Sequence, residues 1–216
     1  PVTVIHAQRI VDTLPDPERC SDARGVLDPD YAAQLQRVLL LRSEGRSQQG
    51  LVAARRLGEQ AAASADVRAR AEAAIEIGHF AMETLQPELA LDQLGRAIRW
   101  ATEAGDTGLV VRAYTAQASV LTAGLGRAED GLAVLRTADA LVDRDLHQAS
   151  IDRARANVLL HLGRYDACAE SAEQALTIVR THHAAAPRLW LPDLRSLASC
   201  RSAGGDADAA RDAASE

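Results

Sequence analysis

The segment ANVLLHLGRY, residues 156–165, decides the fold together with the small and apolar residues that follow it: Cys168, Ala172, Ala175 and Leu176. These residues recur at intervals of three and four, which places them on one face of a helix. Glycine adopts positive φ at low steric cost, so we expect Gly163 to end a preceding helix. The segment therefore predicts two helices joined by a tight turn.

The same order of helix, glycine turn and helix recurs along the chain. The preceding copy contains Ser119, Gly126, Ala128, Gly131, Leu135 and Ala138. Two earlier copies contain Gly78, Ala90, Leu94 and Ala97, with Pro87 at the expected turn, and Val38, Gly45, Gly50, Ala54 and Leu57. A final copy begins at Leu191 and is cut off after Gly205, Ala207 and Ala210. One hairpin cannot bury its own apolar face, so the repetition predicts hairpins that stack on one another.

This pattern resembles the tetratricopeptide repeat (TPR). The matching small, glycine and tyrosine positions are Ala156, Gly163, Tyr165, Cys168 and Ala175, whereas Ala172 is smaller than the residue the repeat prefers. Matching alanines lie 41 residues apart from Ala97 to Ala138 and 37 apart from Ala138 to Ala175, which exceeds the usual repeat of about 34. The resemblance implies an all-α, right-handed α-solenoid of about five TPR-like helix hairpins.

We expect residues 29–216 to form this repeat domain, with the last repeat truncated. Residues 1–28 are expected to form an N-terminal helix and loop, with the end of a preceding repeat as an alternative. The expected helices are 3–13, 29–43, 47–63, 66–84, 87–104, 108–123, 128–142, 146–161, 165–181, 189–202 and 206–216.

The composition supports helices and excludes several kinds of site. Alanine and leucine supply 44 and 27 of the 216 residues, and both favour helices. All 24 basic residues are arginine, which excludes a P-loop, Schiff-base or kinase lysine and suggests a GC-rich, actinobacterial source. The formal net charge of −6, without a dense arginine cluster, predicts no direct nucleic-acid contact. The uncharged segment 113–126 is too short to span a bilayer, so no membrane association is expected.

The sequence predicts neither an enzyme nor a cofactor. The three cysteines, Cys20, Cys168 and Cys200, lack the spacing of a zinc or redox motif, which favours a reducing, cytoplasmic setting. Glu76 and His79 share one helix face, as in di-iron bundles, but no second such pair is present. We therefore interpret them as a solvated helical surface, and His182 and His183 as residues at a helix end.

The resemblance places the binding surface on the first helix of each hairpin. In TPR arrays fixed positions of these helices line a concave groove, and they correspond here to Glu72, Ile75, His79, Met82, Glu83, Ser150, Arg153, Asn157, Leu160, His161, Arg195 and Ser199. Arg153 and Asn157 match positions that hold a peptide carboxylate in some family members, although Ser196 replaces an asparagine expected in the next repeat. We expect Arg153, Asn157, His161 and Arg195 to form a positive patch, and Glu72, His79 and Glu83 to line the groove further along. Trp100 and Trp190 are interpreted as packing residues, with interface anchors as the alternative.

The long repeats also resemble the helical regions of large ATP-binding LuxR-type and maltose-regulator-like bacterial transcription activators. This resemblance implies a sensor or protein-interaction region that binds a partner protein, a peptide or a small anionic inducer. A free-standing TPR scaffold and an all-α metal enzyme are the alternatives, and a homodimer stays open.

Overall fold

The computed structural model describes residues 28–142 and 146–215, and all regular structure in this part of the chain is helical. The α-helices are α2 (Pro29–Ser43), α3 (Ser47–Ala63), α4 (Val67–Glu83), α5 (Pro87–Glu103), α6 (Thr107–Ser119), α7 (Ala128–Asp139), α8 (Leu146–His161), α9 (Tyr165–His182), α10 (Leu191–Ala203) and α11 (Ala207–Ser215). A π-helical segment η2 (Val120–Gly124) continues α6, and a 3₁₀ helix η3 (Pro187–Trp190) precedes α10. The expected helix 3–13 lies outside the described residues.

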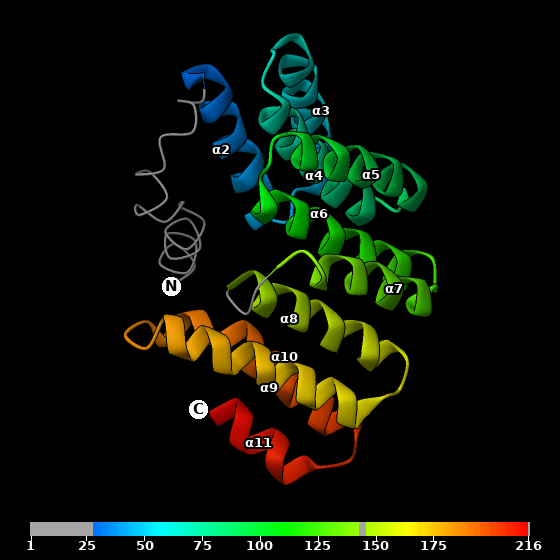
Figure 1. Cartoon of the computed structure of the whole chain (residues 1–216), viewed down its shortest axis with the longest axis vertical. Coiled ribbons are helices and arrows are strands. Elements are labelled where there is room, and N and C mark those ends of the chain that lie inside the picture. The colour runs from blue at the N-terminus through cyan, green and yellow to red at the C-terminus, as the bar shows by residue number, and fades with distance from the viewer. Residues whose placement is uncertain (1–27, 143–145, 216) are drawn as a thin grey trace.

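Consecutive helices pair as antiparallel hairpins that stack in chain order, as Figure 1 shows from α2 at one end to α11 at the other. We call the first helix of each hairpin an A helix (α2, α4, α6, α8, α10) and the second a B helix (α3, α5, α7, α9, α11). The arrangement is a right-handed α-solenoid of five TPR-like hairpins, which confirms the predicted fold class. Most helix ends lie within one residue of the expected ranges. The exceptions are 108–123, which changes from α to π geometry at Val120, 128–142, which ends at Asp139, and 189–202, whose first two residues lie in η3.

The turn inside each hairpin needs one residue with positive φ. Gly163 has φ of 70°, and it follows a helix end closed by hydrogen bonds from Gly163 N to Leu160 O and from Arg164 N to Leu159 O. This is the glycine-terminated helix end predicted from the sequence. The α4–α5 hairpin is different, because its positive-φ residue is Leu85, at 60°. The turn therefore centres on Leu85, two residues before the proline, and Pro87 begins α5, as the expected helix 87–104 requires; a missing N–H costs little at that position.

Small residues lie where neighbouring helices come closest. Ala97, Ala138 and Ala175 are fully buried, as the repeat pattern predicts. A Cβ atom on Gly50 would lie 2.0 Å from Phe80 Cε1, and one on Gly78 would lie 2.8 Å from Leu94 Cγ. These glycines set the spacing between helices.

The apolar core consists of two main clusters that meet at α6. Val110 and Ala113 belong to the N-terminal core, which α2–α5 complete. Val111 and Ala118, on the adjacent face of α6, belong to the C-terminal core, which extends to α11. A disulfide between Cys168 of α9 and Cys200 of α10 lies buried within the C-terminal core. This pairing carries no local sequence signal, because 32 residues separate the two cysteines.

Candidate functional site

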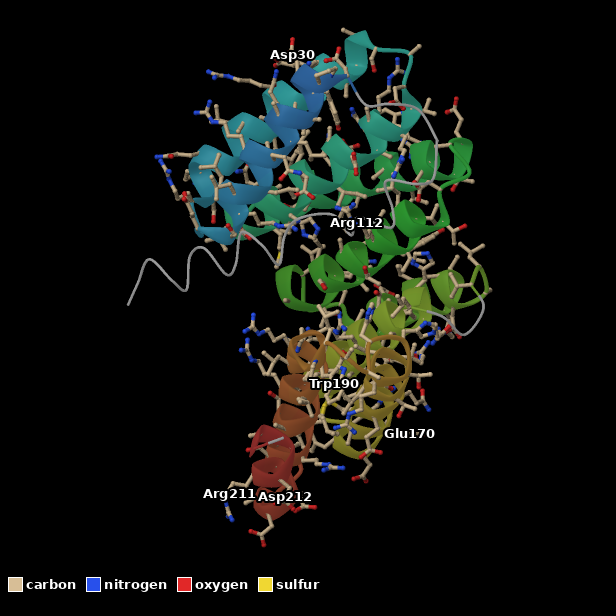
Figure 2. All side chains as sticks on the ribbon, turned by 90° about the vertical axis from the view of Figure 1, so that its left-hand side faces the viewer. Asp30, Arg112, Glu170, Trp190, Arg211 and Asp212 are labelled. Atoms are coloured by element: carbon tan, nitrogen blue, oxygen red, sulfur yellow. A yellow bond between two sulfur atoms is a disulfide. The ribbon has the colours of Figure 1, made fainter. Side chains whose placement is uncertain are left out.

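A groove of about 820 Å³ follows the A-helix side of the solenoid. Its walls come from α4, from α6 with the turn before it, from α8, and from the α9–α10 connection. The titratable residues that line it are Arg68, Glu72, Asp106, Arg112, His147, Arg153, His183 and Arg188. Figure 2 shows Arg112 about midway along the stack, with Trp190 of η3 nearer the C-terminal end. We call this feature the groove.

Arg112 is held in the groove by a buried carboxylate. Glu76 of α4 is fully buried, and its carboxylate lies 2.8 Å from Arg42 Nη1 and 3.1 Å from Arg112 Nη2. One carboxylate thereby joins α2, α4 and α6. Burial raises the pKa of Glu76, while the two guanidinium groups oppose that shift. Because the two arginines stay partly exposed, their remaining N–H groups are open to other acceptors.

The acidic wall of the groove contains a carboxylate oxygen without a hydrogen bond. Glu72 lies 3.9 Å from Arg112 Nη1, and its Oε2 atom is buried without a hydrogen-bond partner. Burial raises the pKa of Glu72, and Arg112 and Arg68 oppose the shift. Asp106 accepts a hydrogen bond from Leu109 N at 2.9 Å at the start of α6 and lies 3.0 Å from Arg68 Nε. Asp106 therefore both caps α6 and offsets the charge of Arg68, whose Nε makes no hydrogen bond.

Arg153 crosses from α8 to α10 and forms a two-point ion pair. Its Nε and Nη2 donate to Oδ1 and Oδ2 of Asp193 at 2.7 and 2.8 Å, and Asp193 is fully buried. The sequence predicts that the charge of Arg153 is available to a ligand. The structure instead balances it with an acidic neighbour and leaves Nη1 outside that pair.

The α9–α10 connection supplies the remaining cation, Arg188. Trp190 anchors this connection, because its Nε1–H donates to His183 O at 3.2 Å and its ring lies 5.2 Å from the Arg180 guanidinium. Trp190 also packs on buried apolar side chains, which agrees with the packing role predicted for it. Arg188 is exposed and makes no ion pair within the described part of the chain.

Of the seven predicted site residues, only Glu72 and Arg153 line the groove. Asn157, His161 and Arg195 are exposed outside it, and the His161 Nδ1 atom lies 2.9 Å from Asn157 O. Glu83 is exposed at the end of α4. Any ligand contact by these residues stays a prediction.

The interpretation of Glu76 and His79 as a solvated surface was wrong. Glu76 is fully buried, and burial together with Arg42 and Arg112 lowers the pKa of His79 to about 3. His79 is therefore neutral near pH 7, close to the two arginines that hold Glu76. Among residues 28–142 and 146–215, no group of three or more histidine, cysteine or acidic residues is placed to hold a metal ion. The same part of the chain contains no helix with the length and apolar character needed to cross a bilayer.

Five titratable groove residues were not predicted as site residues, although one sequence signal points toward the paired arginines; the five are Arg68, Arg112, His147, His183 and Arg188. Partners in the buried ion pairs lie 34 residues apart for Arg42 and Glu76, 36 for Arg112 and Glu76, and 40 for Arg153 and Asp193. These separations are about one repeat long. Opposite charges at one repeat spacing can therefore mark adjacent A helices that pack side by side along the groove.

Solved structures with similar folds include proteins with TPR or TPR-like repeats. A protein of Podosopora anserina assigned as a kinesin light chain, with nearly identical TPR-like repeats, aligns over 88% of this chain and 94% of its own, with 15% identity and a TM-score of 0.61. A thermophilic TPR protein of Thermus thermophilus aligns over 86% and 88%, with 20% identity and a TM-score of 0.62. No protein-family model and no curated protein matches the sequence. At these identities the similarity establishes the fold alone.

Proposed function

We propose that this chain is a non-catalytic recognition module whose groove binds an anionic segment of a partner protein or a small anionic ligand. The observation that carries the proposal is the set of groove arginines fixed by buried carboxylates on neighbouring A helices. An arginine held in one rotamer loses less conformational entropy on binding. Arg112 and Arg153 are therefore prepared to donate further hydrogen bonds to carboxylate or phosphate oxygens.

The charge balance of the groove indicates how such a ligand would be held. Its lining contains four arginines, Glu72 and Asp106, while Glu76 and Asp193 lie immediately behind two of the arginines. At long range these four acids offset the four cations. Binding would then depend on short, directed hydrogen bonds and on Arg188, whose charge has no partner in the described structure.

A substitution pair tests this site against the one expected from the sequence. Arg188→Ala removes the groove cation without an ion pair, and Arg195→Ala removes an exposed cation outside the groove. A partner is first isolated by pull-down and then titrated by calorimetry at two ionic strengths. We expect Arg188→Ala to weaken binding about tenfold, equivalent to about 1.4 kcal/mol, and Arg195→Ala to leave it unchanged. The opposite result would move the site to the patch around Arg195.

Within this function, the sensor region of a bacterial transcription regulator is our narrower proposal. It is supported by the long, arginine-rich repeats, and a free-standing TPR scaffold is supported equally well by the fold. Flanking ATPase and helix-turn-helix modules in the full gene would distinguish the two. The metal-enzyme alternative depends on Glu76, whose carboxylate is engaged by two arginines. The cytoplasmic location stays a prediction and must accommodate the Cys168–Cys200 disulfide, since such bonds are rare in that compartment.

A further inference from the structure

A second pocket lies between α3, α4 and α5, on the side of the solenoid where the B helices run. Its volume is about 470 Å³, within the range of ligand sites. Each helix contributes residues three or four positions apart, which form one continuous face. They are Arg55, Gly58, Glu59 and Ala62 from α3, Arg70, Ala73, Ala74 and Ile77 from α4, and Gln93, Arg96 and Trp100 from α5. We call this feature the B-side pocket.

Small and apolar residues form the floor of the B-side pocket. Ala73, Ala74 and Ile77 are buried, and Gly58 leaves space above Ile77, because a Cβ at Gly58 would lie 3.0 Å from Ile77 Cδ1. Trp100 forms the far wall. It packs against the N-terminal core yet stays only partly buried, so part of its indole is left for a further contact.

The rim of the B-side pocket is cationic, with three arginines and one glutamate. Arg70 is already used, since it donates to Ala61 O and Ala62 O at 3.3 Å, and to Ser64 O, at the end of α3. Arg55 is exposed and makes no ion pair in the described structure. Arg96 pairs with Asp92 at 3.1 Å, but both side chains are about half exposed, and such pairs contribute little stability. Arg55 and Arg96 can therefore both turn toward an incoming carboxylate.

We propose that the B-side pocket binds a partner peptide through one large apolar side chain flanked by acidic residues. The apolar chain lies against Ile77 and Trp100, and the carboxylates meet Arg55 and Arg96. This partner is complementary in charge to the pocket rim although the chain as a whole is acidic. The contact is separate from the groove, because the two sites have no lining residue in common.

The chain itself supplies matched controls for a test. Arg55→Glu with Arg96→Glu reverses the rim charge, whereas Arg56→Glu with Arg99→Glu makes the same change at exposed residues outside the pocket. Ala62→Leu fills the pocket from its exposed edge, and Ala63→Leu adds the same bulk one residue away. Melting temperatures confirm that the four variants are folded.

The probe is a phage-displayed library of random twelve-residue peptides selected on the parent chain. Enriched peptides are synthesised with a fluorescent label and titrated by anisotropy against every variant. We expect the enriched peptides to combine an apolar residue with aspartate or glutamate. Their affinity should fall at least about tenfold for Arg55→Glu/Arg96→Glu and for Ala62→Leu, but less than about twofold for the two control variants. If no enriched peptide separates the pocket variants from their controls, the proposal is overturned. Peptides that respond to Arg188→Ala alone would belong to the groove and would leave the B-side pocket without a ligand.

Discussion

Replacing Leu85 by glycine should stabilise the protein, although it deletes a large side chain. Leu85 is the one non-glycine residue with positive φ in the described structure. Its N–H donates to Met82 O and the next N–H donates to Ala81 O, the hydrogen bonds that also close α8 at Gly163. The left-handed conformation costs a residue with a Cβ about 1–2 kcal/mol. Glycine removes that cost but gains freedom in the unfolded chain, which costs about 0.4–1 kcal/mol.

The side chain contributes little to offset this gain, because Leu85 is 88% exposed. We therefore expect a net stabilisation of about 0.5–1 kcal/mol, measured as a higher midpoint in urea unfolding followed by circular dichroism. Leu141→Gly is the control, since Leu141 is also exposed in a turn but does not have positive φ, and it should destabilise. Gly163→Val makes the reverse change and should cost about 1 kcal/mol or more. If Leu85→Gly lowered the midpoint as much as Leu141→Gly, the reasoning from backbone strain would be refuted.

Three further predictions concern the core, pH and redox state. Ala138→Leu and Ala175→Leu should each destabilise the protein by about 1–3 kcal/mol, because both alanines are fully buried. Glu83→Ala, at an exposed residue, should change stability by no more than about 0.5 kcal/mol in the same denaturation assay. The reverse order would show that the repeats are misaligned. The pKa of His79 falls from 6.5 to about 3 on folding. The unfolded chain therefore binds the proton first, and stability should fall as pH drops from about 6.5 towards 3. His79→Gln should flatten that part of the plot of stability against pH, and an unchanged plot would contradict the lowered pKa of His79. Reducing the Cys168–Cys200 bond, which spans 32 residues, should lower the free energy of unfolding by about 3–4 kcal/mol. A Cys168→Ala/Cys200→Ala variant should show no change with the reductant. If the stability of the parent chain does not change with the reductant either, the bond is not formed.

The sequence predicts the local structure of this protein better than its contacts between repeats. Turn glycines such as Gly163 carry a local signal, because glycine adopts positive φ easily. Buried alanines such as Ala175 carry another, because they occupy a fixed position on a helix face. Leu85 carries no such signal, because the surrounding repeat imposes its conformation against its own preference. The π-helical segment at Val120 was also missed, because π-helical turns are rare and occur mostly as single turns inside α-helices.

The groove was less predictable because its key contacts join residues far apart in the sequence. Glu76 looks like a surface glutamate until α2 and α6 bring Arg42 and Arg112 to it. Asp193 likewise follows a proline in an ordinary helix start, and only the stacking of α8 against α10 shows that it binds Arg153. The predicted positive charge around Arg153 is neutralised for this reason, because the repeat positions that line a groove do not indicate which of their side chains form ion pairs.

The meeting of the two cores at α6 links the curvature of the solenoid to the width of the groove. Arg68 and Glu72 belong to α4, on the side of the N-terminal core, whereas Arg153 and Arg188 belong to elements packed on the C-terminal core. Any rotation of one core against the other about α6 changes the separation of these two walls. A ligand that contacts both walls would then favour one angle between the two cores. If the two cores rotate about α6, binding in the groove and the angle between the two ends of the chain are coupled, and a ligand would change the direction in which those ends point.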